Sequence, residues 1–149
     1  MHESIKFPLG IVGGGRAAWA FGSLWRNAGW SVVGVTLRTG STSAVPAMLE
    51  TERMELRELV AASGIVLVAV SDEQLEDVAR RAVDAAGERA VAFFHPAGAA
   101  TSDVFAPAAL RFSLHPLRSL APPGGDATFD GTLFAFEGEP GTEAIARRI

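Results

Sequence analysis

The residues with the clearest chemical meaning are glycines near the N-terminus, in the pattern Gly13-x-Gly15-x-x-Ala18. The apolar run 9–12 leads into this pattern, and apolar residues at helical spacing follow it over residues 16–28. A strand, a glycine turn and a helix in this order present backbone N–H groups at a helix N-terminus, where phosphate binds. Gly13 is expected to permit the turn, Gly15 to admit a pyrophosphate, and Ala18 to allow close helix packing. The pattern predicts a dinucleotide site; the alternative is an ordinary tight connection between strand and helix.

The residues after the second predicted strand distinguish between the two nicotinamide dinucleotides. An NAD site places an acidic residue about 20 residues beyond the glycines, where it binds the adenosine ribose. Residues 31–49 contain no acidic residue, and the predicted strand 31–37 is followed by Arg38, Thr39 and Ser41. A guanidinium pairs with a 2′-phosphate through two hydrogen bonds, and hydroxyl groups add more, so the sequence favours NADP over NAD. The alternative is that Arg38 is a solvated loop cation. The missing acid also weakens a methyltransferase interpretation.

Two histidines, each followed by proline, stand at the ends of later predicted strands. His95 follows the apolar run 90–94, and His115 follows the predicted strand 111–114. Ligands of open α/β sheets bind beyond the carboxyl ends of the strands, and proline keeps the residue before it extended. Either histidine is therefore a candidate to face a nicotinamide and to exchange the proton that accompanies hydride transfer. The alternative for each is a ring that hydrogen-bonds loop backbone and does no chemistry.

These residues require a scaffold in which strands and helices alternate. Apolar runs predict strands at 9–12, 31–37, 65–70 and 90–94, with shorter edge strands at 111–114 and 132–136. Helical spacing covers residues 16–28 and 75–86, and the latter follows a capping box at residues 71–74. Residues 48–62 have mixed helical character, with a possible short strand near Met54. The sequence predicts an α/β, Rossmann-type doubly wound fold, with a mainly parallel sheet and helices on both faces.

Composition excludes several other classes of function. The chain has 149 residues, the size of one domain, and no cysteine, so disulfides, thiolate zinc sites and cysteine nucleophiles are ruled out. It also lacks a phosphate-loop motif, a nucleophile elbow and metal-ligand spacing. A net charge of -4 argues against nucleic acid, and no apolar run is long enough to span a membrane. Residues 1–8 lack the features of a secretory signal, which predicts a cytoplasmic protein.

At these motifs the sequence resembles a family of Rossmann-like proteins related to pyrroline-5-carboxylate reductase, ketopantoate reductase and the β-hydroxyacid dehydrogenases. The strongest likeness is to a branch, the DUF2520 family, in which a Rossmann-like domain precedes a helical domain of unknown function. The shared segments are Ile11-Val12-Gly13-Gly14-Gly15-Arg16, Val33-Gly34-Val35 leading to Arg38, Val68-Ala69-Val70-Ser71-Asp72, and Ser113-Leu114-His115-Pro116-Leu117. The chain departs from the branch at His95-Pro96-Ala97-Gly98, where the branch has a serine before the glycine.

The resemblance and the motifs together imply an NADP-dependent oxidoreductase that acts on a small carbonyl or imine substrate. Residues 1–137 are expected to form the dinucleotide-binding domain, and residues 138–149 a linker and the start of a helix. That helix would lead to a missing C-terminal domain, which completes the active site and forms a homodimer in such families, so the isolated domain is expected to be inactive. The alternative function is a non-catalytic NADP-binding or sensing module. The predicted cofactor-binding residues are Gly13, Gly14, Gly15, Arg16, Ala17, Ala18, Arg38, Thr39, Ser41, Val70, Ser71 and His95.

Overall fold

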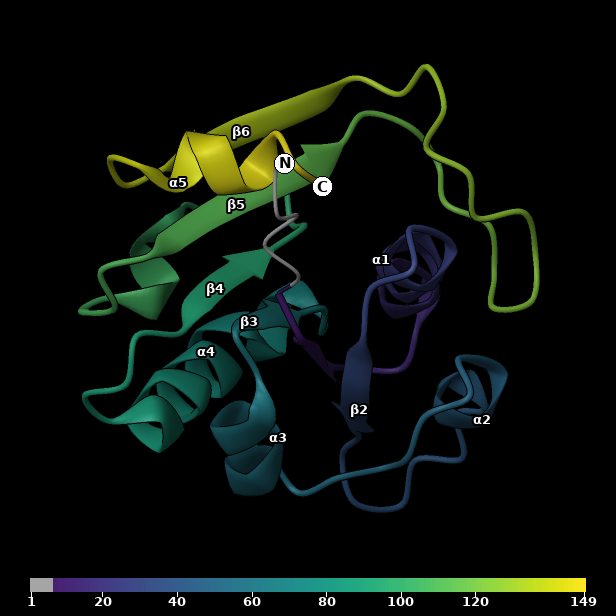
Figure 1. Cartoon of the computed structure of the whole chain (residues 1–149), viewed down its shortest axis with the longest axis horizontal. Coiled ribbons are helices and arrows are strands. Elements are labelled where there is room, and N and C mark those ends of the chain that lie inside the picture. The colour runs from purple at the N-terminus through teal and green to yellow at the C-terminus, as the bar shows by residue number, and fades with distance from the viewer. Residues whose placement is uncertain (1–6) are drawn as a thin grey trace.

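The computed structural model describes residues 7–149, which form one six-stranded sheet with helices on both faces (Figure 1). The strands lie in the order β2-β1-β3-β4-β5-β6; the first five along the chain are parallel, and β6 is antiparallel to β5. Their bounds are β1 (Leu9–Val12), β2 (Val32–Thr36), β3 (Ile65–Val68), β4 (Ala92–His95), β5 (Arg111–Pro116) and β6 (Phe134–Gly138). The predicted Rossmann-type α/β fold is confirmed. Residues 1–6, which carry most of the expectation about a secretory signal, lie outside the described residues.

Two helical layers cover the two faces of the sheet. The helices are α1 (Arg16–Asn27), α2 (Val45–Met48), α3 (Leu56–Ala62), α4 (Asp72–Ala86), the 3-10 turn η1 (Ser102–Phe105) and α5 (Thr142–Ala146). Figure 1 shows α3 and α4 together on one side of the strands, opposite α1. No helix within residues 7–149 has the length and apolar character needed to cross a membrane.

The continuous apolar runs of the central strands supply two separate cores. In β3, Ile65 and Leu67 belong to the core beneath α1, whereas Val66 and Val68 belong to the core beneath α3 and α4. All four side chains are fully buried. A strand that is covered on both faces has no solvent-facing side, so it carries no polar alternation.

The segment between β2 and α3 contains the short strand contact expected near Met54. Val35 pairs with Arg53 in a single parallel bridge, in which the Val35 N–H donates to the Glu52 carbonyl and the Met54 N–H donates to the Val35 carbonyl, both at 2.9 Å. The bridge covers the outer edge of β2. The mixed helical character predicted for residues 48–62 corresponds to α3, whereas α2 lies almost entirely before that range.

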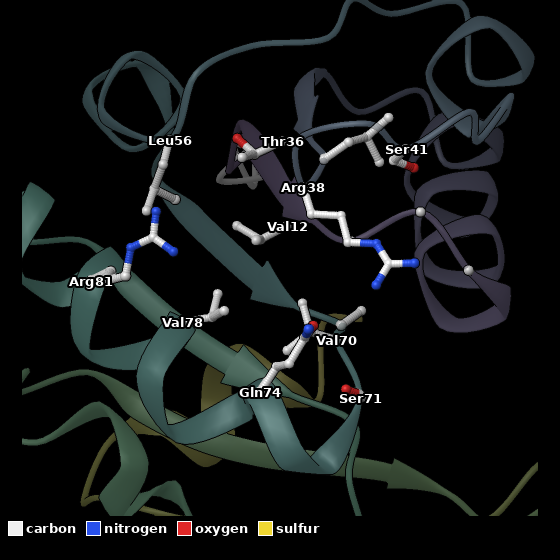
Figure 2. Close-up of a pocket in the computed structure, with 15 residues that line it drawn as sticks. Val12, Thr36, Arg38, Ser41, Leu56, Val70, Ser71, Gln74, Val78 and Arg81 are labelled. Carbon is white, nitrogen blue, oxygen red and sulfur yellow. The ribbon is translucent and has the colours of Figure 1, made fainter.

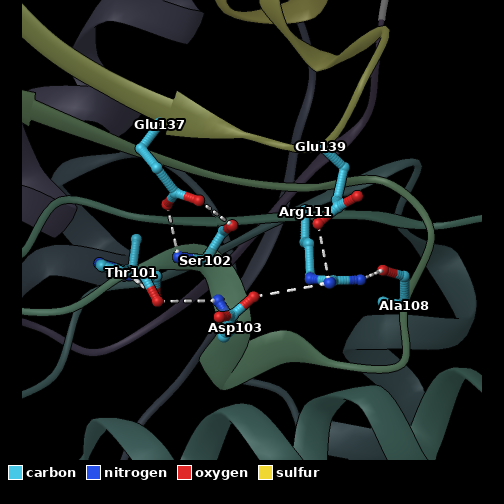
Figure 3. A network of polar contacts seen from close by, with 8 residues as sticks. Thr101, Ser102, Asp103, Ala108, Arg111, Glu137 and Glu139 are labelled. Atoms are coloured by element: carbon cyan, nitrogen blue, oxygen red, sulfur yellow. Dashed lines mark hydrogen bonds and ion pairs between the residues drawn. The ribbon is translucent and has the colours of Figure 1, made fainter.

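A polar network fixes the C-terminal hairpin to the rest of the sheet (Figure 3). The Arg111 side chain, which is 17% exposed, pairs with Glu139 at 2.8 Å and Asp103 at 3.5 Å. The Glu137 carboxylate accepts hydrogen bonds from the backbone N–H and the hydroxyl of Ser102, at 2.7 and 2.8 Å. These contacts hold β6 against the start of η1. The predicted edge strand at 132–136 is therefore present, but lies two residues later along the chain.

The turn after β1 depends on Gly13. Its φ of 119° lies in a region that side chains disfavour, and a Cβ built there would be 2.0 Å from the Ala69 carbonyl oxygen. Ala69 itself is held in place because its N–H donates to the Val12 carbonyl at 2.8 Å. The chain therefore turns at the end of β1 only with glycine at this position.

Gly13→Ala is expected to destabilise the fold by about 3 kcal/mol or more, because strained backbone and overlap with a fixed carbonyl add together. Urea denaturation followed by tryptophan fluorescence measures the free energy of unfolding. Gly15→Ala is the matched control, since Gly15 has a φ of -105° and no atom within 4 Å of the added Cβ. Its free energy of unfolding should stay within about 1 kcal/mol of the parent value. Equal losses in the two variants would contradict this account of the turn.

Candidate nucleotide-binding site

The carboxyl ends of β1, β2 and β3 border a cavity of about 440 Å³ (Figure 2). Its lining comes from the glycine turn, the segment after β2, the end of β3, and one face of α4. The lining residues are Val12, Gly13, Gly14, Gly15, Thr36, Leu37, Arg38, Ser41, Leu56, Ala69, Val70, Ser71, Gln74, Val78 and Arg81. In parallel α/β sheets ligands bind at this edge, where successive loops meet.

The three glycines of the turn have three different environments. Gly13 makes the turn itself. At Gly14 a Cβ would lie 2.5 Å from the Ser43 hydroxyl oxygen, so neighbouring protein atoms fill that space. At Gly15 no atom lies within 4 Å of an added Cβ. Gly15 is therefore the position where the backbone faces open space and a ligand can approach it closely.

The N-terminus of α1 borders the cavity, and no side chain caps its backbone N–H groups. Gly15 is the N-cap residue, no side-chain cap hydrogen bond is formed, and the first turn holds no acidic residue. The first N–H groups of a helix have no partner within the helix, and its dipole favours a negative charge there. The turn thus provides the donors and the field that an anionic group such as pyrophosphate requires.

The capping box predicted at the start of α4 is not formed. Ser71 occupies the N-cap position in an extended conformation, but its hydroxyl makes no capping hydrogen bond. The Gln74 backbone N–H instead donates to the Ser71 carbonyl at 3.0 Å. Ser71 and Gln74 both line the cavity (Figure 2). The side chains that the motif assigns to capping are therefore available to a ligand.

The segment after β2 is a compact turn linked to the glycines. The Ser41 N–H donates to the Arg38 carbonyl at 3.1 Å, and Gly40 between them has a φ of 83°. Ser43 then donates its hydroxyl to the Gly14 carbonyl at 2.7 Å. This bond joins the two loops whose residues line the cavity, so Arg38 and Ser41 occupy a fixed place relative to the glycine turn.

Several predicted cofactor-binding residues lie outside the cavity lining. Ala18 belongs to α1 and is fully buried in the core between this helix and the sheet, as its predicted packing role requires. The Arg16 guanidinium donates to the Leu120 carbonyl at 3.0 Å, which directs it toward the loop between β5 and β6. Ala17, Thr39 and His95 are also absent from the lining. The structure brings together Gly13, Gly14, Gly15, Arg38, Ser41, Val70 and Ser71.

The cavity has a second basic wall, which the sequence interpretation missed. Gln74, Val78 and Arg81 lie at spacings of four and three residues, so they share one face of α4. Figure 2 shows Arg81 and Arg38 on opposite sides of the cavity, with the apolar side chain of Val12 between them. The signal for this wall in the sequence was the presence of Gln74 and Arg81 at helical spacing with Val78. A helix face that only packs in a core would not include an arginine.

His95 is buried, and both ring nitrogens bond the loop that follows β4. Its side chain is 0% exposed; Nε2 lies 3.0 Å from the Thr101 carbonyl, and Nδ1 accepts from the Ala97 N–H at 3.1 Å. A carbonyl accepts and an N–H donates, so these bonds select the neutral ring with its proton on Nε2. Burial lowers the pKa of His95, and the opposing effects of the Thr101 bond and of Glu137 and Asp72 are smaller. The geometry favours the structural alternative for His95.

His115 stands in a different environment. Its Nδ1 lies 2.7 Å from the Pro96 carbonyl, and its ring packs on Gly98, where a Cβ would be 3.0 Å from Nε2. The ring borders a second cavity of about 240 Å³, whose lining includes Gly98, Ser113 and Glu137. Because Nδ1 donates to the carbonyl, the neutral ring keeps an unprotonated Nε2. Of the two predicted histidines, His115 retains a nitrogen for chemistry.

Comparison with known proteins identifies the fold family. A model of the Rossmann-like domain family matches residues 3–117. No curated protein sequence matches the chain significantly.

Solved structures with the same fold include proteins named as an oxidoreductase, a dehydrogenase and a reductase. A protein of Bacteroides fragilis, described as a candidate NADP oxidoreductase, has a TM-score of 0.78 at 18% identity, over 96% of this chain and 57% of its own. The 3-hydroxyisobutyrate dehydrogenase of Mycobacterium tuberculosis has a TM-score of 0.71 at 18% identity, over 96% and 50%. The pyrroline carboxylate reductase of Plasmodium falciparum, solved with NADP bound, has a TM-score of 0.65 at 11% identity, over 97% and 54%. The chain thus spans about half the length of these proteins.

The burial of His95 predicts a pH-dependent contribution to stability. The unfolded chain takes up a proton near the ordinary histidine pKa of about 6.5, whereas the folded ring does so only at lower pH. The free energy of unfolding therefore falls as the pH drops below about 6.5 toward the folded pKa.

His95→Asn retains an acceptor for the Ala97 N–H but neither titrates nor reaches Thr101. Near pH 7.5 the variant should be less stable by about 1–3 kcal/mol, because buried hydrogen bonding is lost. This difference should shrink as the pH falls toward 5, since at that pH only the parent protein loses stability by keeping a buried histidine ring neutral. Urea denaturation at several pH values measures it; a difference that stays constant between pH 5 and 8 would contradict the burial argument.

Proposed function

Because the chain belongs to the Rossmann-like domain family, we propose that it is the NADP(H)-binding domain of an oxidoreductase that acts on a small carbonyl or imine. One observation carries the proposal: open space over Gly15 lies between the uncapped start of α1 and the Arg38 turn, with no acidic residue in the cavity lining. This arrangement suits a dinucleotide whose adenosine carries an extra phosphate.

Each part of the adenosine half of the cofactor can be assigned to a region of the cavity. The pyrophosphate would lie at Gly15 and the first N–H groups of α1. The adenine would lie between the apolar side chains of Leu56 and Val78, where Arg81 stands at the rim. The 2′-phosphate would pair with the Arg38 guanidinium and the Ser41 hydroxyl, as the missing acid after β2 suggests.

The order of the strands supports a path of the nicotinamide half toward His115. From β2 to β5 the carboxyl ends follow each other across four strand spacings, roughly 19 Å, in the order β2, β1, β3, β4, β5. A dinucleotide held at β2 and β1 therefore extends over β3 and β4 toward the end of β5. The cofactor supplies hydride chemistry when bound. His115 would exchange the accompanying proton at Nε2, oriented by its bond to the Pro96 carbonyl.

The complete reaction needs more protein than this chain. The structurally similar enzymes are about twice as long, and we infer that a further domain closes the substrate site and forms a homodimer. The small-molecule substrate is proposed from the motifs and the family resemblance, and the cytoplasmic location, with no nucleic acid or membrane partner, from the sequence composition. In a protein that includes the further domain, His115→Ala should abolish most turnover, and unchanged turnover would exclude a catalytic role for His115. Tight NADP(H) binding with no turnover in the parent protein would favour the non-catalytic sensing module.

The cofactor preference is tested by calorimetric titration of the chain with NADPH and NADH. The parent protein should bind NADPH more tightly, and Arg38→Ala should reduce NADPH affinity by about tenfold to a hundredfold, because a charge-assisted pair to phosphate is lost. NADH affinity should change much less.

Arg57→Ala is the matched control, since it removes the same charge from an exposed position on α3 that does not line the cavity. It should leave both affinities within about twofold. Equal binding of the two nucleotides by the parent protein would remove the NADP assignment, and binding of neither would remove the main support for the oxidoreductase.

A further inference from the structure

The bridge between Val35 and Arg53 places Arg53 beside the turn formed by residues 38–41. The backbone on both sides of it is bonded to Val35, through the Glu52 carbonyl and the Met54 N–H at 2.9 Å each. Arg53 does not line the cavity. Its side chain starts from the outer edge of the sheet, next to the strand end from which the turn leaves.

The Arg53 guanidinium donates hydrogen bonds to both ends of this turn. Nη2 donates to the Arg38 carbonyl at 2.9 Å, and Nη1 donates to the Ser41 carbonyl at 3.1 Å. The Arg38 carbonyl also accepts the Ser41 N–H that closes the turn. A planar fork with two donors fixes the separation of both carbonyls, which a single ammonium group cannot do.

This contact has an electrostatic effect on the cavity as well as a geometric one. Carbonyl oxygens carry partial negative charge, and they would repel a phosphate held by Arg38 and Ser41. Here two of them are bound by a cation on the side of the turn where Arg53 lies. Beyond the turn, the Ser43 N–H donates to the Ser41 hydroxyl oxygen at 3.3 Å, and Ser43 bonds Gly14. A series of hydrogen bonds therefore connects Arg53 to the glycine turn, through the Arg38–Ser41 turn and Ser43.

We propose that Arg53 is a positioning residue that sets the preference for the 2′-phosphorylated nucleotide, acting through the Arg38–Ser41 turn without touching the ligand. The inference rests on the proposed NADP site. It assigns the preference to a residue 12 to 15 positions away along the chain, joined to the site by hydrogen bonds to carbonyls only.

The probes are 2′,5′-ADP and 5′-AMP, which differ only by the 2′-phosphate, titrated against the whole chain by calorimetry. The parent protein should bind 2′,5′-ADP more tightly. Arg53→Lys, which retains the charge, and Arg53→Ala should each weaken 2′,5′-ADP binding about five- to tenfold and change 5′-AMP binding less than twofold. In an Arg38→Ala background the same replacements should have almost no further effect, because the two residues act on one phosphate.

The control Arg57→Ala removes an exposed charge from neighbouring α3 and should change neither affinity. Unfolding by urea, measured for each variant, confirms that the variants being compared are folded.

The outcomes distinguish a failure of the positioning role of Arg53 from a failure of the NADP site. If the parent protein prefers 2′,5′-ADP but Arg53→Lys binds it equally well, Arg53 acts as a charge alone and the positioning role is overturned while the NADP site stands. If Arg53→Lys loses both ligands equally, the residue supports the site in general and does not set the preference. If the parent protein shows no preference, the NADP site and this inference both fail.

Discussion

The arrangement of the site depends on how the chain leaves the central strand β1. At Gly13 the backbone passes so close to the Ala69 carbonyl that no side chain fits, while the Gly13 N–H donates to the Thr36 carbonyl at 2.9 Å. Ala69 in turn donates to the Val12 carbonyl. The ends of β1, β2 and β3 are therefore tied together at one point. The loops that leave this point have to surround the same space, and that space is the cavity.

Around this junction, the residues that face the cavity and the residues that hold them are different. Gly15, Arg38 and Ser41 face the space in which a nucleotide would lie, whereas Ser43 and Arg53 bond the backbone of those segments. The bonds from the Ser43 hydroxyl and the Arg53 guanidinium go to carbonyl groups, so they fix the backbone and do not occupy the Arg38 guanidinium. A loop organised in this way retains its shape without the ligand, which lowers the entropic cost of binding.

Local patterns in the sequence predicted the parts of the structure that local physics determines. The glycine turn and the apolar strands were predicted from residue type and spacing, whereas the order of the strands was not predicted, because it depends on contacts between segments far apart in the sequence. The capping box was wrong: Ser71 is the N-cap of α4, but its hydroxyl makes no capping hydrogen bond, and both Ser71 and Gln74 line the cavity. Arg53 and Arg81 were missed because their roles depend on contacts between separate segments. For His95, the pattern placed the ring at the strand end, but its burial comes from the η1 loop folding over it.

The central claim, that a dinucleotide lies over Gly15 and along the turn after β2, is tested most directly by titrating the ¹⁵N-labelled chain with NADP⁺ in amide NMR spectra. The account predicts that the largest shifts fall on the amides of Gly15, Arg16 and Ser41, with smaller ones along the cavity face of α4. The amides of Gly87 and Glu88, beyond the far end of α4, should stay in place. Shifts centred on Gly87 and Glu88, or an unperturbed glycine turn at saturating nucleotide, would contradict the account.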